Sequence, residues 1–229
     1  MKFELNKIYN IDCMEAFLKM PDNSVDMILT DIPYGEVNKY GNEDVDNNDI
    51  RQFHKGKADM VTFNVAEFVK QCARVCSGNV YIFCGIEQVS EIRRTFVELG
   101  LSTRHCVWEK TNPSPTNGQY MWLSNIENCI YAKKSGSVHN EFCKGTVWRY
   151  PTTKSDIHPT QKPIKLFRYL INASSNESMT ILDPCIGSGT TAIACMDMGR
   201  NFIGFELDKE YFDLANERIQ AEQSQIRMF

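Results

Sequence analysis

Short apolar runs alternate with helical patterns along the chain. The apolar runs predict strands at 24–30, 79–84, 101–110, 125–134, 179–183 and 201–206. A helical spacing of apolar residues predicts helices at Val61–Cys76, 87–100 and 162–174, after Gly189, and from Asp208 onward. This alternation predicts an α/β fold, with a mostly parallel sheet that is covered by helices on both faces.

Two polar segments fall outside this pattern. The segment 36–59 is rich in Asn and Asp and predicts a mobile loop, while 111–119 (TNPSPTNGQ) carries Pro and Gly residues that interrupt regular structure. A length of 229 residues suits one domain better than two. We therefore expect a single domain, 1–229, with the mobile loop 36–59 and a small insertion at about 111–157.

The composition is that of an ordinary globular protein. Hydrophobic residues make up 42% and charged residues 24% of the chain, and no apolar run approaches the roughly 18 residues of a membrane span. The N-terminal sequence MKFELNKIYN lacks the apolar region of a signal peptide. The expectation is a cytoplasmic protein that has no membrane partner.

The nine cysteines lie mainly in hydrophobic stretches, where a reduced thiol acts as a small apolar side chain. We therefore expect them in the core. The one close pair, Cys72 and Cys76, falls on the helix predicted at 61–76 with no second ligand pair nearby, so no metal site is expected.

The charge of the chain is unevenly distributed. A net charge of −4 weighs against nucleic-acid binding. The middle of the chain nevertheless gathers several basic residues, namely Lys110, Lys133, Lys134, Lys144, Arg149 and Lys154. This stretch is where a phosphate contact is expected.

A glycine-rich turn, DPCIGSGT at 183–190, joins the strand at 179–183 to the next helix. Gly187 and Gly189 would let the backbone approach a ligand at the helix N-terminus, and Glu206 at the end of the next strand suits a ribose diol. The turn lacks the Lys of a phosphate-binding loop and the third glycine of a dinucleotide fingerprint. The turn therefore favours binding of an adenosine ligand without a pyrophosphate. The alternative interpretation is a tight turn that binds no ligand.

A second signal, Asp31-Ile32-Pro33-Tyr34, directly follows the strand at 24–30. Pro33 biases Ile32 toward an extended conformation, so that the Ile32 carbonyl can point outward. This carbonyl and the Asp31 carboxylate are two acceptors for the hydrogens of an exocyclic amine, and the Tyr34 ring can stack on a base. Alone, the tetrapeptide could be a surface turn. Beside the glycine-rich turn at one sheet edge, it predicts a methyl-transfer site.

These segments resemble those of the amino-methylating DNA methyltransferases of the beta group, in which an Asp-Pro-Pro-Tyr-type motif precedes the cofactor glycines. Three other segments are similar to the family's: 10–14 (NIDCM), 158–163 (HPTQKP) and 203–206 (IGFE). The resemblance covers nearly the whole chain. It implies a Rossmann-like, S-adenosylmethionine-dependent methyltransferase fold with a circularly permuted motif order, in which 111–157 is the target-recognition insertion.

The resemblance also implies roles for individual residues. The catalytic residues would be Asp31, Ile32, Pro33 and Tyr34, which would hold a flipped adenine for direct in-line transfer to its N6 amine. The cofactor-binding residues would be Asp12, Cys13, His158, Thr160, Lys162, Asp183, Cys185, Gly187, Ser188, Gly189, Thr190 and Glu206. Three of these have simpler interpretations, since Asp12 and His158 could be helix caps and Lys162 a solvated charge.

DNA itself is the implied partner, and its contacts are expected from Lys110, Asn112, Trp122 and Arg149. Trp122 flanks the Pro-rich loop and would serve as a stacking platform for a base, although large aromatics near strands more often belong to the core. Trp108 has the same two interpretations.

Two positions depart from the family's pattern. Ile32 stands where the family has its first proline, which removes rigidity but keeps the carbonyl. Cys185 replaces a phenylalanine that packs near the cofactor, so weaker cofactor affinity is expected. Neither change removes a required polar group, and activity is therefore still expected.

Three alternatives stay open. The nearest is methylation of cytosine N4, although similar enzymes that act on cytosine more often carry Ser at the position of Asp31. A glutamine methyltransferase acting on proteins is disfavoured, because that group carries Asn at this position and places the motif after the glycines. The third is a DNA-binding homologue that has lost catalysis, suggested by Ile32 and the acidic net charge. A homodimer and a cognate restriction endonuclease are the candidate protein partners.

Overall fold

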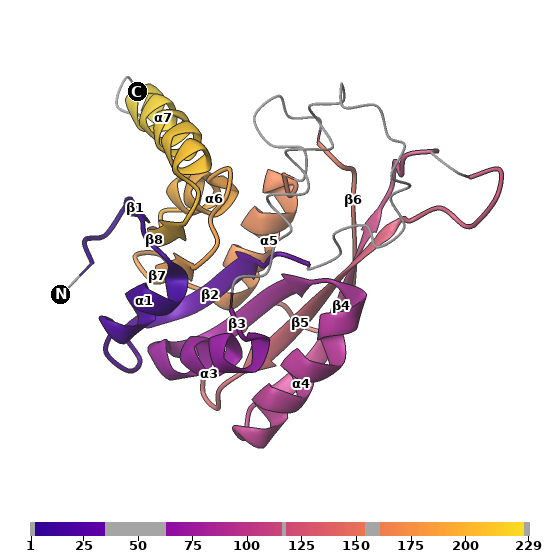
Figure 1. Ribbon diagram of the computed structural model, residues 1–229, viewed down its shortest axis with the longest axis horizontal. Coiled ribbons are helices and arrows are strands. Elements are labelled where there is room, and N and C mark those ends of the chain that lie inside the picture. Colours follow the sequence, from indigo (N-terminus) through magenta and orange to yellow (C-terminus); the bar gives the residue numbers. More distant parts are fainter. Residues whose placement is uncertain (1–2, 35–62, 116–117, 154–160, 227–229) are drawn as a thin grey trace.

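The computed structural model describes residues 3–34, 63–115, 118–153 and 161–226 of the chain (Figure 1). The loop predicted at 36–59, together with Lys154, His158 and Thr160, lies outside the described residues. Within these ranges no helix combines the length and the apolar character that crossing a membrane would require.

One eight-stranded sheet forms the centre of the molecule, in the order β1-β8-β7-β2-β3-β5-β4-β6. Only β5 runs antiparallel to its described neighbours; the other pairs are parallel. The strands are β1 (Lys7–Asn10), β2 (Val25–Asp31), β3 (Cys76–Cys84), β4 (Ser102–Lys110), β5 (Ile126–Lys133), β6 (Val147–Tyr150), β7 (Thr180–Asp183) and β8 (Asn201–Glu206).

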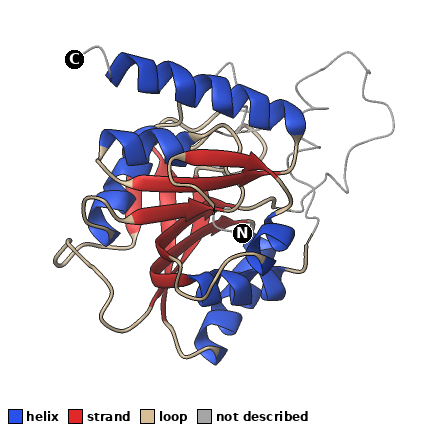
Figure 2. Cartoon of the chain, turned by 90° about the vertical axis from the view of Figure 1, so that its left-hand side faces the viewer, coloured by secondary structure: helices blue, strands red, loops and turns tan. Residues whose placement is uncertain are grey.

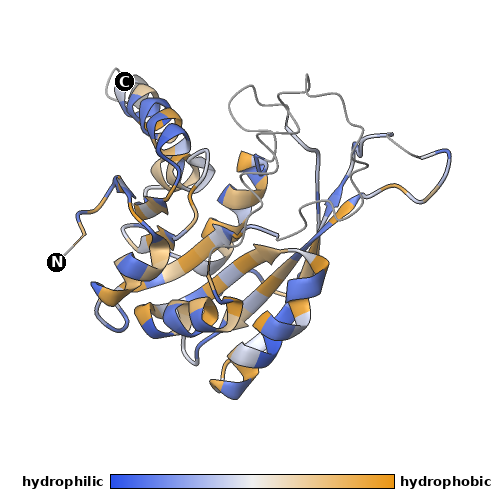
Figure 3. Ribbon diagram, in the orientation of Figure 1, coloured by the Kyte–Doolittle hydropathy of each residue, from blue (hydrophilic) through white to orange (hydrophobic). Residues whose placement is uncertain are grey.

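Helices cover both faces of this sheet (Figure 2). One face packs against α1 (Cys13–Leu18), α3 (Val65–Val75) and α4 (Val89–Glu98), which follows the short 3-10 helix η1 (Ile86–Gln88). The other face packs against α5 (Ile164–Ser174), α6 (Thr190–Asp197) and α7 (Lys209–Ile226). The apolar residues gather in the strands, whereas α7 is largely hydrophilic (Figure 3). Burial of apolar side chains on the two faces is the main force that holds the layers together.

The predicted α/β fold, with its mostly parallel sheet between helices, is therefore confirmed. The sequence patterns missed β1, α1 and β6, which span four, six and four residues and mix polar with apolar side chains, so that none shows a clear apolar run. The helix predicted at Val61–Cys76 was wrong at its end, because Cys76 already belongs to β3 and pairs with Val25.

The range 111–157 contributes β5 and β6 to the main sheet, so only its loops can form an insertion. Those loops remain the predicted target-recognition region.

Seven of the nine cysteines are buried, as predicted; Cys143 is exposed and Cys185 is partly buried.

The sheet order brings the two chemical motifs together. β2 and β7 are parallel neighbours, with Ile28 paired to Leu182, so their carboxyl ends lie at the same edge. Asp31 ends β2 and Asp183 ends β7. β8 follows β7 on the far side, and Asp183 pairs with Gly204, two residues before Glu206. In open α/β sheets ligands bind at this carboxyl edge.

Candidate active site

The Asp31–Tyr34 turn is fixed by the strand and helix beside it. The Ile32 backbone N–H donates to the Phe83 carbonyl at 3.2 Å, which extends the pairing of β2 with β3, and the Ile32 side chain is only 2% exposed in the core. The Gln88 side-chain amide then links the turn to β3. Its Nε2 donates to the Pro33 carbonyl and its Oε1 accepts the Gly85 N–H, both at 2.9 Å. The turn is therefore held in one conformation.

Gly85 also has a steric role beside this turn. A Cβ built on Gly85 would lie 3.1 Å from both the Cβ and the carbonyl oxygen of Tyr34. Because Cβ contacts this short are uncommon, a side chain at Gly85 would push Tyr34 away.

Four charged side chains meet at the end of β2. The Lys162 ammonium bonds to Asp31 Oδ2 and lies 3.0 Å from Glu127 Oε2. The Lys110 ammonium lies 2.9 Å from Glu127 Oε1, and the Tyr34 hydroxyl donates to Glu127 Oε2 at 2.9 Å. We call Asp31, Tyr34, Lys110, Glu127 and Lys162 the catalytic cluster, because it contains two of the residues that the sequence predicts to be catalytic, Asp31 and Tyr34. Two carboxylates face two ammonium groups in it, so the charges balance.

Burial sets the protonation of this cluster. Burial alone would lower the pKa of Lys162, but Asp31 and Glu127 outweigh it and raise that pKa to about 12. Burial alone would raise the pKa of Glu127, but Lys162 and Lys110 lower it to about 2. For Asp31 burial prevails over the attraction of Lys162, and Glu127 adds to it, so the pKa of Asp31 is raised. Asp31 is thus the carboxylate in the cluster that takes up a proton most readily.

One oxygen of Asp31 is left without a partner. Lys162 occupies Oδ2, whereas Oδ1 is buried and accepts no hydrogen bond within the described structure. A buried acceptor that has lost water and gained no donor costs about 1–3 kcal/mol. A ligand that brings an N–H group to this point would satisfy the oxygen.

The glycine-rich turn lies at the end of β7. Gly187 and Gly189 have φ angles of +50° and +79°, which residues with a Cβ adopt only with strain. Among the described residues, a Cβ on Gly187 would meet only the Cys185 carbonyl oxygen, at 4.0 Å, so this part of the chain leaves the space beside the glycine open. The Ile186 N–H donates to the Phe205 carbonyl at 2.9 Å, which ties the turn to β8.

Two carboxylates accept hydrogen bonds from this turn and its neighbouring residues. Asp183 accepts the Cys185 N–H at 3.1 Å and the Thr191 hydroxyl at 2.5 Å. Its burial raises the pKa of the carboxyl to about 7. Glu206 accepts the Gly187 N–H and the Asp208 N–H, both at 2.9 Å. A carboxylate offers about four lone-pair sites, so Glu206 can also accept hydroxyl groups of a sugar.

The other predicted cofactor residues fall into three groups. Asp12 is the N-cap of α1, since its carboxylate accepts the backbone N–H groups of Met14 and Glu15. Cys13 is buried next to Cys185, and a hydrogen bond between the two thiols, with burial, raises the pKa of Cys185. Ser188 and Thr190 are buried in the turn with their hydroxyls 3.2 Å apart.

Lys162 is not a solvated charge. It is 5% exposed and belongs to the catalytic cluster.

Three of the residues predicted to bind DNA are engaged by other groups of the protein, although Asn112 and Arg149 are exposed. Lys110 pairs with Glu127, Arg149 lies 2.8 Å from Glu109, and Asn112 accepts the Thr152 N–H at 2.6 Å. Trp122 is different, because it is 97% exposed in the loop between β4 and β5. Trp108 is buried and belongs to the core.

The basic residues in the middle of the sequence do not form one surface. Lys110 lies in the catalytic cluster, whereas Lys134 donates to Asn23 at 2.9 Å, at the opposite end of β5. Lys133 and Lys144 line a separate pocket.

Sequence reasoning missed Glu127 and Gln88. Glu127 is a carboxylate near the start of a mostly apolar strand, and Gln88 is a buried amide at a helix start. An unexplained polar residue at a strand end was the available signal for Glu127. Only the pairing of β5 with β3 and β4 shows which groups it meets.

Two features thus meet at one edge of the sheet: a buried carboxylate oxygen that can accept an N–H group, and an open glycine-rich turn followed by a terminal carboxylate. This combination is typical of an enzyme that transfers a group from an adenosine-containing cofactor to an amine.

The family is shown by comparison with known proteins. Residues 25–217 match the model of the N6/N4 methyltransferases, described as DNA methylase. The chain belongs to this DNA methylase family.

Individual relatives agree with this assignment. The chain is 30% identical over 240 residues to the Type II methyltransferase M.HpaI of Haemophilus parainfluenzae, covering 92% of this chain and 73% of that one. The crystal structure of the M1.HpyAVI–SAM complex is 28% identical, with a TM-score of 0.70 and coverage of 93% and 98%. The PvuII DNA methyltransferase, titled cytosine-N4-specific, shares the fold, with a TM-score of 0.69 at 15% identity and coverage of 96% and 92%. The permuted Rossmann-like methyltransferase fold is thereby confirmed.

Proposed function

We propose that this DNA methyltransferase transfers the methyl group of S-adenosylmethionine to the N6 amine of adenine in DNA. The observation that carries the proposal is Asp31 Oδ1, a buried acceptor at the carboxyl edge of the sheet that has no partner among the described residues. An exocyclic amine has the two hydrogens that Asp31 Oδ1 and the Ile32 carbonyl would accept.

The glycine-rich turn fits the cofactor. The open space at Gly187 and the carboxylate of Glu206 suit an adenosine group, and a solved relative at 28% identity is a complex with S-adenosylmethionine. We assign Asp12, Cys13, Cys185, Ser188, Gly189 and Thr190 to the walls of this site. Asp183 would act through the turn, because its carboxylate is already bonded to Cys185 and Thr191. When bound, S-adenosylmethionine supplies an electrophilic methyl group.

The catalytic cluster would act on the target amine. Asp31 Oδ1 accepts one amine hydrogen and directs the nitrogen lone pair away from itself, toward the methyl carbon. As the amine would gain the methyl group, the sulfur–methyl bond of the cofactor would break and the positive charge would pass from sulfur to nitrogen. A fixed carboxylate would stabilise that charge more than it stabilises the neutral amine. The raised pKa of Asp31 makes it a suitable acceptor for the proton that the amine must finally lose.

Lys162 and Glu127 would position these groups. Lys162 holds Asp31 Oδ2, so that only Oδ1 faces the substrate. Glu127 holds the Tyr34 hydroxyl and thereby orients the ring that stacks on the base. Each of these side chains bonds to a residue that we place against the base, so we assign both to positioning.

The DNA contact is supported by the loop between β4 and β5. Tyr120, Met121 and Trp122 are 81%, 67% and 97% exposed. This loop leaves β4 directly after Lys110, at the edge that holds the catalytic cluster. Exposed aromatic side chains at this edge suit stacking against bases, for example beside the gap that a flipped adenine leaves.

Cytosine N4 is the second candidate target. It carries the same kind of amine, and the fold is shared with a cytosine-N4-specific enzyme. Asp31 favours adenine, because similar enzymes acting on cytosine more often carry Ser there. A homodimer and a cognate restriction endonuclease remain predictions.

A DNA-binding homologue without catalysis is disfavoured by the environment of Ile32. Its N–H donates to the Phe83 carbonyl, a bond that the family's proline could not make, and its side chain is buried. These contacts replace the rigidity that a proline ring would supply.

The decisive experiment measures transfer of labelled methyl from S-adenosylmethionine to DNA of mixed sequence, with the product nucleosides identified by mass spectrometry. We expect N6-methyladenine. Asp31→Asn and Asp31→Ala should each lower the rate by about 100-fold or more, because a transition-state contact is lost. Asp213→Asn, the same change at an exposed position on α7, should keep full activity.

Each other outcome has a distinct meaning. Detection of N4-methylcytosine as the product would identify cytosine, in place of adenine, as the target. Unchanged activity in Asp31→Asn would remove Asp31 from the mechanism. No label on any DNA, with cofactor binding retained, would favour the homologue that only binds DNA.

A further inference from the structure

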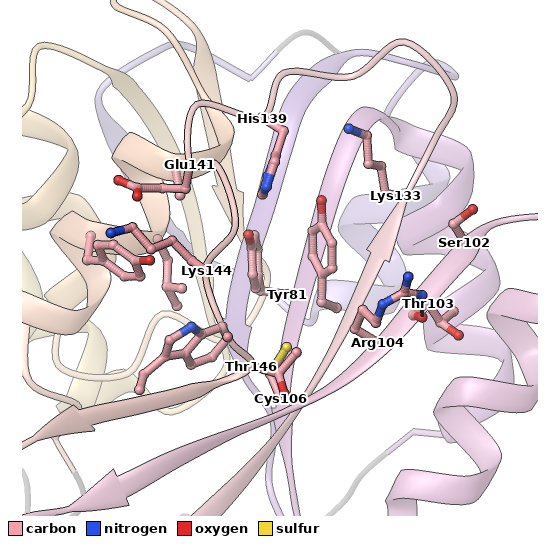
Figure 4. A pocket seen from close by; sticks show the side chains of 16 residues that line it. Tyr81, Ser102, Thr103, Arg104, Cys106, Lys133, His139, Glu141, Lys144 and Thr146 are labelled. Carbon is pink, nitrogen blue, oxygen red and sulfur yellow. Dashed lines mark hydrogen bonds between the residues drawn. The ribbon is translucent and has the colours of Figure 1, made fainter.

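A second pocket lies on the α5 face of the sheet, apart from both motifs (Figure 4). Its volume is about 290 Å³. It is formed by the middle of β3, the first half of β4, the end of β5, the loop before β6, β6 itself and the end of α5. Asp31, Tyr34, Glu127, Lys162 and the glycine-rich turn do not line it.

This pocket is separated from the catalytic cluster by packed rings. The Phe83 ring lies 6.3 Å from the Trp148 ring in the pocket wall and 5.7 Å from the Lys162 ammonium in the cluster. On β4, Arg104 at the pocket stands six residues before Lys110 in the cluster, which is about 20 Å along an extended strand. The two sites are therefore distinct.

The interior of the pocket is aromatic. Tyr81, Tyr131, Trp148 and Tyr169 line it, with the Tyr81 and Tyr131 rings 4.7 Å apart. Both of these hydroxyls are already engaged. Tyr81 bonds to the Ser174 hydroxyl at 2.7 Å, and Tyr131 donates to Asn79 at 2.9 Å. What these residues offer to a ligand is therefore ring surface.

The rim of the pocket carries three cationic side chains and one carboxylate. Arg104 and Lys133 stand on one side of Tyr81, and Lys144 stands on the other beside Glu141, with His139 above (Figure 4). The cations outnumber the carboxylate, so the rim is positive on balance. Elsewhere Lys110, Arg149, Lys162 and Arg168 each meet a carboxylate. Within the described structure Arg104, Lys133 and Lys144 form no ion pair, although the chain carries a net charge of −4.

Unpaired cations around an aromatic interior select a ligand that is both planar and anionic. The cations would bind a phosphate, Arg104 through paired N–H donors, and the rings would stack on or pack against a base. The hydroxyls of Thr103 and Thr146 at the rim can bond to a sugar or to a base edge. A volume of about 290 Å³ lies at the lower end of ligand pockets, which suits one nucleotide unit.

We propose that this pocket binds a nucleotide, a heteroaromatic base that carries a phosphate, at a site separate from the catalytic cluster. The nucleotide comes either free or as one unit of a single DNA strand. Both sources present the same base and phosphate to the pocket.

Calorimetric titration with adenosine monophosphate tests the proposal. The protein is first saturated with S-adenosylhomocysteine, so that the cofactor site cannot take the probe. One adenosine monophosphate should bind per chain. The double variant Arg104→Gln/Lys133→Gln should weaken this binding by about tenfold or more, since two phosphate contacts are lost. Adenosine and inorganic phosphate alone should each bind more weakly than the whole nucleotide.

Two further variants separate binding from folding. Arg93→Gln/Lys165→Gln makes the same change of charge on exposed parts of α4 and α5 and should leave the affinity unchanged. Thr146→Trp places a large side chain at the exposed mouth of the pocket and should abolish binding while thermal stability is kept.

The source of the nucleotide follows from competition with a short thymidine oligonucleotide. If the oligonucleotide displaces adenosine monophosphate at a lower concentration than that at which the free nucleotide binds, the ligand is a DNA strand. If a higher concentration is needed, the ligand is the free nucleotide. The proposal is overturned by absence of binding to the saturated protein. It is also overturned if nucleotide binding is the same in the wild type, in Thr146→Trp and in Arg104→Gln/Lys133→Gln. A third contradicting outcome is a protein that binds no nucleotide but forms a dimer that Thr146→Trp dissociates.

Discussion

The Lys162 ammonium bonds to the Asp31 carboxylate across 131 positions of sequence. Lys162 precedes α5 and Asp31 ends β2, so the contact exists only because α5 packs on the face of the sheet next to β2. A second carboxylate, Glu127, lies 3.0 Å from the same ammonium. Lys162 thus controls the charge of the carboxylate that we propose accepts the target amine, which leads to two opposite predictions.

Glu127→Gln should shift the acid limb of the pH–rate profile to lower pH. The charge of Glu127 helps to raise the pKa of Asp31, and its removal leaves Lys162 free to act on Asp31 alone. Loss of the charged partner of Tyr34 should also lower kcat by about 10-fold or more. Methyl-transfer rates measured across pH check both effects.

Glu109→Gln is the matched control, because Glu109 is a carboxylate of the neighbouring β4 that pairs with the exposed Arg149. It should change neither the limb nor kcat. A profile for Glu127→Gln that keeps its shape while kcat falls would mean that Glu127 acts only through structure.

Lys162→Met should shift the same limb in the opposite direction. Burial and the charge of Glu127 both raise the pKa of Asp31, and the attraction of the Lys162 ammonium opposes them. When this ammonium is removed, the pKa of Asp31 rises further. The variant should be nearly inactive at neutral pH and recover part of its rate in alkaline buffer. Lys165→Met, on the exposed side of α5, is the control. Equal loss of activity at all pH values would contradict this role.

Asp183 should make the stability of the protein depend on pH. Burial raises its pKa from 3.8 to about 7, so the folded state binds the proton more tightly than the unfolded chain does. The free energy of unfolding should therefore fall as the pH rises through this interval.

Asp183→Asn tests this dependence, because an amide does not titrate. Its free energy of unfolding relative to the wild type should increase by up to about 1.4 kcal/mol per pH unit across the interval. Urea unfolding between pH 4 and pH 8, without cofactor, measures the difference, and Asp213→Asn should show none. A constant difference between the two proteins would assign the proton to another group.

Gly204→Ala should destabilise the cofactor edge of the sheet. A Cβ at Gly204 would lie 2.3 Å from the Ile186 Cδ1 atom and 3.0 Å from the Ile8 Cγ2 atom. Overpacking of this kind costs about 1–3 kcal/mol.

Chemical unfolding should show this loss, and Ile186→Val in the same chain should restore part of it, since valine lacks the Cδ1 atom. Gly145→Ala, at a position with no atom within 4 Å, should leave stability nearly unchanged. Equal stability of Gly204→Ala and the wild type would mean that Ile186 moves freely.

Much of the fold and part of the site could be predicted from the sequence. The period of the apolar residues predicts the longer strands and helices, because each must bury one face against the sheet. Gly187, Gly189 and Glu206 could be predicted because their spacing is local and reflects backbone conformation. The short elements β1, α1 and β6 could not be predicted, since they are brief and mix polar with apolar side chains, so that no apolar run stands out.

The sequence by itself thus determined the α/β class, the two motifs and their order, because these depend on neighbouring residues. Only the tertiary structure decided how the motifs are charged. Burial and long-range pairing bring Glu127 and Lys110 to Lys162 and leave Asp31 Oδ1 without a partner in the part of the chain that the structure describes. The same holds for the second pocket, whose cations come from β4, β5 and the loop before β6. Charges that lie far apart in the chain interact according to distance and burial in the folded state, and local sequence fixes neither quantity.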